Sequence, residues 1–299
     1  MIQVQTVKTK SLLLPKNAKQ TLLGETRAFT LNIYRGCTHG CIYCDSRSDC
    51  YHVDDFDTIR PKERALEILE KELKSKKRSG IANTGSMTDP YNPLETELQL
   101  TRRSLELFKK YSFGASLITK SASVVRDIDL FQDIHSVNPF HLLMTITTPK
   151  DALSAKIEPY VSSSSQRFQA LKELHKAGLY TGIFLSPLLP FITDSPDDLQ
   201  ELLELAAESG VTYIIAFLGV TLRAGSREFF YQHLDKSFPG LKGRYQQTYG
   251  LDYSCSVPNA SLLYEQFYST CRKMGIMTNY AQIRDQIFNR WANEQLTLF

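Results

Sequence analysis

The fold of this chain is decided by residues 28–44, AFTLNIYRGCTHGCIYC. In the first half of this stretch, the apolar side chains of Phe29, Leu31 and Ile33 alternate with more polar neighbours. This period of two residues predicts a β-strand over residues 28–34. A loop with two glycines and three closely spaced cysteines follows directly. The cysteines are therefore expected to lie at the carboxyl end of this strand.

Strands and helices alternate along the following part of the chain. Apolar runs predict five more strands, over residues 81–86, 115–119, 141–147, 180–185 and 211–220. Capping and periodicity predict helices over residues 61–78, 98–111, 124–134, 167–177 and 195–209. Such a series requires a parallel sheet with outer helices, and right-handed crossovers favour closure into a barrel. The predicted fold is α/β, a partial (β/α)6 TIM-type barrel; a doubly wound open sheet is the alternative.

The domain organisation follows from the same alternation. No linker rich in proline, glycine or serine divides the chain, and no internal repeat stands out beyond the alternation. We expect an N-terminal arm over residues 1–27, a barrel core over residues 28–221 and a mostly helical C-terminal extension over residues 222–299.

Composition places the chain among ordinary globular proteins. Hydrophobic residues make up 42% of the 299 residues and charged residues 22%, which excludes disordered and collagen-like proteins. No apolar stretch approaches the roughly 20 residues that span a bilayer, and no signal peptide is recognisable, so we expect a cytoplasmic protein. The net charge of +3 is too small to indicate a nucleic-acid partner by itself.

Three cysteines carry the clearest chemical signal. Cys37, Cys41 and Cys44 follow a three-then-two spacing in a loop that also contains Gly36 and Gly40. Thiolates are soft ligands that suit iron–sulfur clusters or zinc, and the glycines let the backbone wrap closely around an inorganic core. Structural zinc normally fills four positions, whereas three cysteines on a cubic [4Fe–4S] cluster leave one iron free to bind a substrate or cofactor.

The other cysteines are harder to interpret. Cys50 could be a fourth ligand, a hydrogen-atom donor or an inert thiol, and the inert interpretation is favoured. Cys255 and Cys271 are too few and too far apart to specify a second cluster. The metal prediction therefore stays with Cys37, Cys41 and Cys44.

Longer motifs surround the cysteines. The C-x3-C-x2-C loop, with an aromatic residue before its last cysteine, resembles that of the radical S-adenosylmethionine (SAM, AdoMet) superfamily. Residues 32–41 (NIYRGCTHGC), 85–95 (GSMTDPYNPLE), 100–103 (LTRR) and 118–121 (ITKS) resemble the branch related to spore photoproduct lyase, a DNA repair photolyase-like group. This resemblance extends from about residue 29 to residue 220.

The resemblance implies a cofactor chemistry. Cys37, Cys41 and Cys44 would hold a [4Fe–4S] cluster whose free iron chelates the amino and carboxylate groups of SAM. An electron from an external flavodoxin- or ferredoxin-like donor would cleave SAM to a 5′-deoxyadenosyl radical, which abstracts hydrogen from the substrate. The protein's task would be to place one C–H bond and exclude water.

The resemblance also implies SAM contacts at the carboxyl ends of strands, where a parallel barrel gathers its active site. These are the backbone of Tyr43 at the adenine, Gly85, Ser86, Thr88 and Asp89 at the amino group, Lys120 at the carboxylate, and Thr145 and Thr147 at the ribose. Each has a structural alternative: a turn around Asp89, a surface position for Lys120, and β-propensity for the two threonines. His39 is expected to play a structural hydrogen-bonding part.

One departure from the pattern concerns the reaction itself. Spore photoproduct lyase uses a cysteine hydrogen donor near its second-strand motif, but residues 85–88 contain no cysteine. This difference weighs against that exact reaction and leaves Cys50 as a weak candidate donor.

The substrate is predicted from weaker signals. Residues 229–233, 242–245 and Tyr249 mix aromatic and basic side chains, which can stack bases and neutralise phosphate, or can simply pack inward as a helical cover. The final residues, Gln295, Leu296, Thr297, Leu298 and Phe299, resemble the peptide that bacterial replication proteins insert into the sliding clamp.

We therefore expect a radical SAM enzyme acting on a lesion-like nucleic acid. The alternatives are RNA, peptide or small-metabolite modification, and a noncatalytic metal-binding interaction protein.

Overall fold

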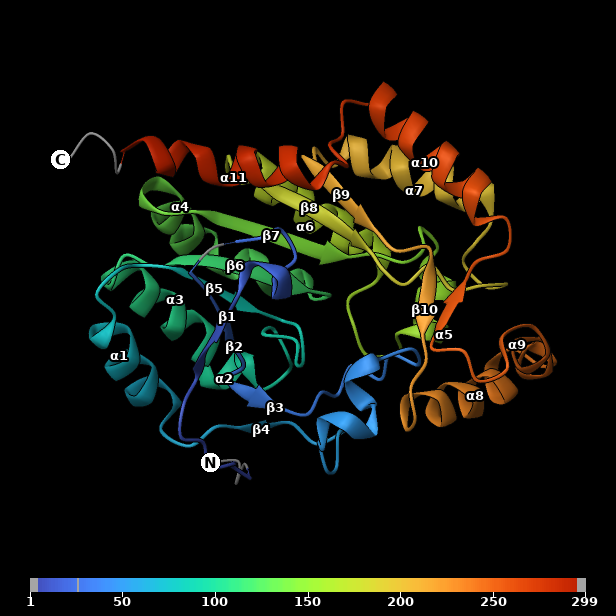
Figure 1. Cartoon of the computed structure of the whole chain (residues 1–299), viewed down its shortest axis with the longest axis horizontal. Helices are drawn as coiled ribbons and strands as arrows, with labels where there is room; N and C mark the ends of the chain where they lie inside the picture. Colours follow the sequence, from blue (N-terminus) through green and yellow to red (C-terminus); the bar gives the residue numbers. More distant parts are fainter. Residues whose placement is uncertain (1–4, 26, 295–299) are drawn as a thin grey trace.

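The computed structural model of the chain describes residues 5–25 and 27–294. Its main sheet comprises β1 (Leu13–Lys16), β2 (Ala28–Leu31), β5 (Ile81–Thr84), β6 (Gly114–Thr119), β7 (Phe140–Thr145), β8 (Thr181–Leu185) and β9 (Tyr213–Ala216). The strands from β2 to β9 are parallel neighbours in chain order, and β1 pairs antiparallel with β2 at the edge (Figure 1). The six parallel strands confirm the predicted partial barrel, to which β1 adds an edge strand that was not predicted.

Helices connect these strands as expected. They are α1 (Ala65–Ser75), α2 (Glu95–Leu98), α3 (Leu100–Lys110), α4 (Ile128–Val137), α5 (Asp151–Ile157), α6 (Ser164–Lys176) and α7 (Pro196–Glu208). At the start of α7 the Ser195 side chain accepts a hydrogen bond from the backbone N–H of Asp198, which confirms the predicted N-cap. The helix predicted over residues 124–134 begins instead as a 3-10 turn over Ala122–Asp127 and continues as α4.

Two predicted strands are divided in the structure. The run over residues 211–220 supplies β9 and then β10 (Gly219–Thr221), which leaves the main sheet to pair antiparallel with β11 (Ser254–Ser256). The run over residues 28–34 likewise supplies β2 and β3 (Tyr34–Arg35), and β3 pairs with β4 (Arg60–Pro61). An apolar period of two residues indicates an extended backbone but not which strand it pairs with.

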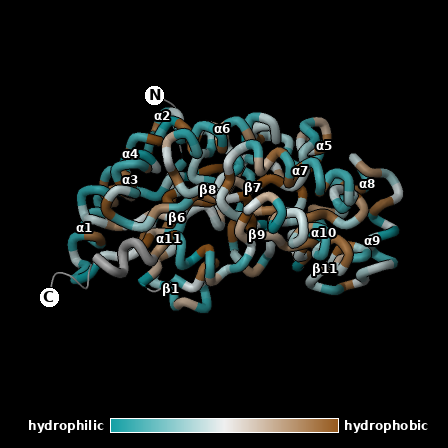
Figure 2. The backbone as a smooth tube through the Cα atoms, turned by 90° about the horizontal axis from the view of Figure 1, so that it is seen from above, coloured by the Kyte–Doolittle hydropathy of each residue, from teal (hydrophilic) through white to brown (hydrophobic). Residues whose placement is uncertain are grey.

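The hydrophobic core lies between the sheet and its helices. Strand residues that include Leu117, Leu142, Met144 and Ile183 belong to one continuous apolar core with residues of α1, α3, α4, α6 and α7. Figure 2 shows the apolar colour concentrated along the central strands and hydrophilic residues on the outer turns. Because side chains alternate along a strand, neighbours of these residues, such as Ser116, face the inner side of the sheet.

One end of this inner side is closed by the last described helix, α11 (Tyr280–Glu294). Its Ile283 and Ile287 pack in one buried cluster with Leu23 and with Tyr213, the first residue of β9. Because Tyr213 marks the amino end of its strand, α11 covers the amino ends. The site residues predicted from the sequence lie at the opposite, carboxyl ends.

A buried histidine lies at the closed end. Nδ1 of His141 is 2.9 Å from the hydroxyl oxygen of Tyr213, and its Nε2, which has no hydrogen-bond partner, is 4.0 Å from Oε1 of Glu25. Burial lowers the pKa of His141 to about 4, against the opposing effect of Glu25. The imidazole is therefore neutral at pH 7.

The C-terminal region is mostly helical, with α8 (Ser226–Ser237), α9 (Leu241–Tyr249), α10 (Ala260–Lys273) and α11. α10 packs against α7, and α8 lies beside the 3-10 turn that follows the cysteines (Figure 1). Phe230, Tyr231 and Tyr245 are buried against Ile42 and Tyr43, so these aromatics pack inward as a cover and do not present rings to a nucleic acid.

None of the described helices is both long and apolar enough to cross a membrane. The clamp-like residues 295–299 lie outside the described residues.

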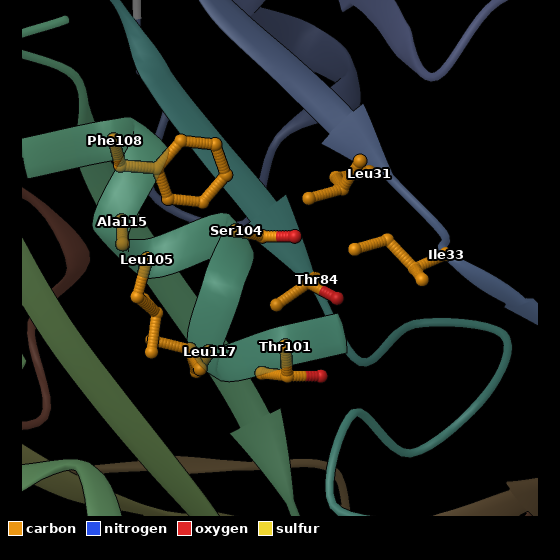
Figure 3. Close-up of a pocket in the computed structure, with 9 residues that line it drawn as sticks. All are labelled: Leu31, Ile33, Thr84, Thr101, Ser104, Leu105, Phe108, Ala115 and Leu117. Atoms are coloured by element: carbon orange, nitrogen blue, oxygen red, sulfur yellow. The ribbon is translucent and has the colours of Figure 1, made fainter. Parts of the chain in front are cut away.

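A small cavity lies on the helix-facing side of the sheet (Figure 3). Its volume is about 10 Å³, and it is lined by Leu31, Ile33, Thr84, Thr101, Ser104, Leu105, Phe108, Ala115 and Leu117. A volume of this size holds about one water molecule. This cavity is a packing gap between α3 and the sheet, and the candidate site lies elsewhere.

Candidate active site

The cysteine loop follows β3 and is held by close backbone contacts. The N–H of Cys37 donates to the Phe56 carbonyl oxygen at 2.7 Å. Gly36 has φ +81°, and a Cβ there would lie 2.2 Å from the Thr58 carbonyl oxygen. Gly40 has φ +66° and lies under Tyr160, whose ring would be 2.9 Å from an added Cβ. Both glycines are therefore required by the fold of the loop itself.

The three thiols of this loop are free, with Cys37 and Cys41 buried and Cys44 half-buried. Burial raises the pKa of Cys37 to about 11, although the backbone N–H groups of His39 and Asp89 act in the opposite direction. Burial also raises the pKa of Cys41. In the described part of the chain, no three His, Cys, Asp or Glu side chains converge closely enough to hold a single metal ion. Three soft donors on one loop fit an iron–sulfur cluster, which is ligated at separate irons whose positive charge offsets the cost of buried thiolates.

The loop after β5 packs directly on the cysteine loop. The Thr88 hydroxyl donates to the Gly36 carbonyl oxygen at 2.9 Å, and the Ser46 hydroxyl lies 3.4 Å from the Ser86 carbonyl oxygen. Gly85 has φ +98°, and a Cβ there would lie 1.9 Å from the Ile118 carbonyl oxygen. The structure thus brings Gly85, Ser86 and Thr88 together with the cysteines, and Gly85 is needed for close approach to β6.

Asp89 joins three parts of the site. Its Oδ1 accepts hydrogen bonds from the Thr119 hydroxyl at 2.7 Å and the Tyr91 N–H at 2.8 Å. Its Oδ2 accepts from the Lys120 N–H at 2.7 Å and lies 3.6 Å from Nδ1 of His39. Asp89 therefore does more than form a turn, because it fixes the β5 loop to the end of β6 and to the cysteine loop. His39 is buried beside Asp89, and its structural hydrogen-bonding role stays a prediction.

Four charged residues, Glu95, Arg102, Arg126 and Asp127, form what we term the loop-holding network. Oε1 of Glu95 lies 3.0 Å from Nη2 of Arg126, and Glu95 also accepts a 2.5 Å hydrogen bond from the Tyr34 hydroxyl. Asp127 pairs with Arg102 at 2.9 Å and with Arg126 at 2.8 Å. Glu95, from the motif over residues 85–95, and Arg102, from the motif over residues 100–103, therefore act as structural residues that join these segments to residues 126 and 127.

Lys120 lies at the end of β6, and its ammonium group has no anion paired with it in the described part of the chain. Among the described residues, no hydrogen bond or ion pair involves its Nζ, which lies 5.8 Å from the ring centre of Tyr43. Burial alone would lower the pKa of Lys120, but the neighbouring Cys41 and Glu158 outweigh it, and the pKa is raised. An unpaired ammonium beside the cysteine loop fits an anionic group such as the SAM carboxylate.

The two threonines predicted as ribose contacts lie at and beyond the end of β7. The side chain of Thr145 alternates with Met144 and so faces the inner side of the sheet. The buried Thr147 Oγ1 has no hydrogen-bond partner, and the same holds for Thr38 Oγ1 and Asn83 Nδ2. Buried polar atoms are normally paired, so these unpaired atoms fit a polar ligand.

Glu158 and Arg167 also belong to this site and were missed by sequence reasoning. The Tyr43 hydroxyl donates to Glu158, and Arg167 forms an ion pair with the same carboxylate. Both charged side chains are fully buried. No local pattern indicated this, because Arg167 occupies a helix start that is usually exposed.

Cys50 lies apart from these contacts. Its side chain is exposed and accepts a hydrogen bond from Nη1 of Arg223 at 3.5 Å, and the Arg223 guanidinium lies 4.7 Å from the ring centre of Tyr253. Its role as a hydrogen donor stays a prediction.

Sequence comparisons identify relatives of this chain. The family model described as the Radical SAM superfamily matches residues 31–221. An uncharacterized protein of Mycobacterium tuberculosis is 29% identical over 229 residues, which are 74% of this chain and 67% of the relative. The Radical SAM Nalpha-GlyT isomerase of Pseudomonas phage M6 is 25% identical over 180 residues, 60% of this chain and 36% of the relative.

Structural comparison identifies a shared fold. A mutant of spore photoproduct lyase superposes with a TM-score of 0.63 at 13% identity, covering 90% of this chain and 79% of that chain. Another mutant, with bound AdoMet and dinucleoside spore photoproduct, gives a TM-score of 0.56 at 14% identity, covering 94% and 78%. At these identities the likeness concerns the fold alone.

Proposed function

Because the chain belongs to the radical SAM superfamily, it is an enzyme that uses a [4Fe–4S] cluster and SAM, and we propose that Cys37, Cys41 and Cys44 hold that cluster. The observation that carries this assignment is the position of three free thiols in one loop, next to the unpaired Lys120. When bound, the cluster and SAM supply a 5′-deoxyadenosyl radical.

The residues around the loop would orient SAM. Lys120 would pair with its carboxylate, and Thr145 and Thr147 would contact the ribose. The backbone of Tyr43 would lie against the adenine. For Gly85, Ser86, Thr88 and Asp89, we propose that the backbone of their loop receives the amino group. The Asp89 carboxylate would hold that loop in place, because its oxygens already accept hydrogen bonds from Thr119, Tyr91 and Lys120.

We propose a nucleic-acid substrate that carries a lesion or a modified base. The spore photoproduct lyase fold, which binds a dinucleoside in one neighbour, supports this proposal, as does the phage relative named for its action on Nalpha-GlyT. The unpaired Nδ2 of Asn83 offers a hydrogen bond that a base or sugar oxygen can accept. A base would have to be extruded or single-stranded to reach it.

Two partners follow from this function. Radical SAM enzymes need an external electron donor, and a flavodoxin- or ferredoxin-like protein would serve here. The sliding-clamp interaction through residues 295–299 stays a prediction from the sequence.

The decisive experiment is anaerobic iron–sulfide reconstitution followed by measurement of 5′-deoxyadenosine with damaged DNA, undamaged DNA, RNA and peptides. We expect damaged DNA to stimulate SAM cleavage. Stimulation by RNA alone would move the substrate from DNA to RNA, and stimulation by peptide alone would contradict the nucleic-acid proposal; both results would leave the SAM chemistry intact.

The cluster assignment is tested by Cys41→Ala with Cys271→Ala as the matched control, because both thiols are buried and only Cys41 lies in the loop. We expect Cys41→Ala to lose bound iron, sulfide and all turnover, whereas Cys271→Ala keeps them. Full iron content and turnover in Cys41→Ala would refute the assignment.

A further inference from the structure

The ion pair between Glu158 and Arg167 lies in the interior beside the cysteine loop. Nη2 of Arg167 is 2.5 Å from Oε2 of Glu158, and neither side chain has any exposed surface. Removing two charges from water is costly, so a buried ion pair adds little net stability. Its presence at this position therefore points to another role.

Arg167 is fixed by every part of its guanidinium group. Nε donates to the Ser162 carbonyl oxygen at 2.8 Å, Nη1 to the Thr145 carbonyl oxygen at 2.8 Å, and Nη2 also to the Ser154 hydroxyl at 3.1 Å. The rigid fork of arginine therefore joins the carboxyl end of β7 to the corner between α5 and α6. Glu158 has one defined cationic partner.

Lys120 is a second cation on the same side of the site, because its Nζ lies 5.8 Å from the ring centre of Tyr43, whose hydroxyl donates to Glu158. Burial alone would raise the pKa of Glu158, but Arg167 and Lys120 outweigh it, and the pKa is lowered. Only Arg167 is within ion-pair distance of Glu158 among the described residues. Without Arg167, Lys120 is the cation that would be left to compensate the buried carboxylate.

We propose that Arg167 is a positioning residue that occupies Glu158 and so keeps the Lys120 ammonium free for the SAM carboxylate. This inference rests on the role proposed above for Lys120. Glu158 in turn accepts the Tyr43 hydroxyl hydrogen bond, which anchors the cysteine loop. The pair thus fixes the loop without adding a net charge beside the cluster, and it leaves the Lys120 ammonium available to a ligand.

The test compares three variants: Arg167→Met, Glu158→Gln and the double variant. SAM affinity is measured by equilibrium dialysis on the anaerobically reconstituted enzyme. In Arg167→Met, we expect about tenfold weaker SAM binding or worse, because the freed carboxylate captures Lys120. Glu158→Gln should stay within about threefold of wild type, since it leaves no charge to capture Lys120.

The double variant decides between positioning and simple structural support. Because it removes both charges, we expect SAM affinity within about threefold of Glu158→Gln, and thus clear rescue of Arg167→Met. Electron paramagnetic resonance of the reduced cluster should shift on SAM addition in the double variant as in wild type. If the double variant binds SAM as weakly as Arg167→Met, Arg167 acts only by holding β7, and the proposal is overturned.

Two controls separate the possible failures. If Arg167→Met does not fold, as judged by circular dichroism and iron content, the double variant still carries the test. Lys120→Met tests the underlying assumption: unchanged SAM affinity there would refute the role of Lys120. Weakened binding in Lys120→Met together with unchanged binding in Arg167→Met would refute only the present inference.

Discussion

Two groups of polar and charged side chains in the region of the candidate site differ in whether all their members have partners. In the loop-holding network, Glu95 and Asp127 are buried and each is paired with arginine. On the other side, Lys120 has no paired anion and Thr147 has no hydrogen-bond partner among the described residues. A network in which every charged group has a partner supports the fold, whereas polar groups without partners can still bind a ligand.

The largest expected effect comes from breaking the complete network. Asp127→Asn removes the buried carboxylate that Arg102 and Arg126 share, and it should lower the free energy of unfolding by about 3 kcal/mol. Chemical denaturation measures this loss. SAM affinity of the folded enzyme should not change.

The matched control for that substitution is Asp133→Asn. Asp133 also pairs with a cation, Lys109 at 2.7 Å, but both side chains are about half exposed. Its loss should cost less than about 1 kcal/mol. Equal destabilisation by the two substitutions would show that burial and completeness do not distinguish the networks.

A smaller effect is expected at the closed end of the sheet, where an unpaired polar atom lies far from the cysteines. The pKa of His141 in the folded protein is about 4, below its ordinary value of 6.5. Its contribution to stability is therefore complete above about pH 6.5 and is lost as the pH falls toward 4, because only the unfolded state takes up the proton. Wild type should lose about 2 kcal/mol between pH 7 and pH 5 from this group.

His141→Gln isolates that contribution, because glutamine can still hydrogen-bond to Tyr213 but does not titrate. The pH dependence of unfolding between pH 7 and 5 should be flatter in the variant by the same amount. Parallel curves for the two proteins would show that His141 is not held neutral.

The smallest expected energy is at Lys120, where the effect appears in binding and not in stability. Lys120→Met should weaken SAM binding about tenfold, which corresponds to about 1.4 kcal/mol. The free energy of unfolding should stay the same or rise, since an unpaired, partly buried ammonium is removed. A loss of stability with unchanged SAM affinity would place Lys120 with the structural residues.

Much of the fold was predictable because apolar periodicity reports the sheet directly. All six parallel strands were predicted from it, as was the cap of α7 at Ser195. β1 was missed because it has only four residues, contains Pro15 and shows no alternation that distinguishes it from a loop. The division of the run over residues 211–220 was missed because the pairing of β10 depends on β11, far along the chain.

Residues of the candidate site could be predicted only where their chemistry is local in sequence. Thiol spacing indicated the cysteines, and the motif resemblance indicated Asp89 and Lys120. Glu158 and Arg167 could not be identified, because whether a charged residue is buried depends on partners brought in by other elements. The same limit applied to Phe230, for which an inward and an outward orientation were both compatible with the sequence.

An open barrel has two free sheet edges, and each is an opportunity for strand addition by another molecule. At one edge, Met277 exchanges hydrogen bonds with Thr212 and Ile214 beside β9. At the other, β1 is short and includes Pro15, which has no N–H to offer an incoming strand. The barrel can therefore stay incomplete without exposing long sheet edges that would favour aggregation.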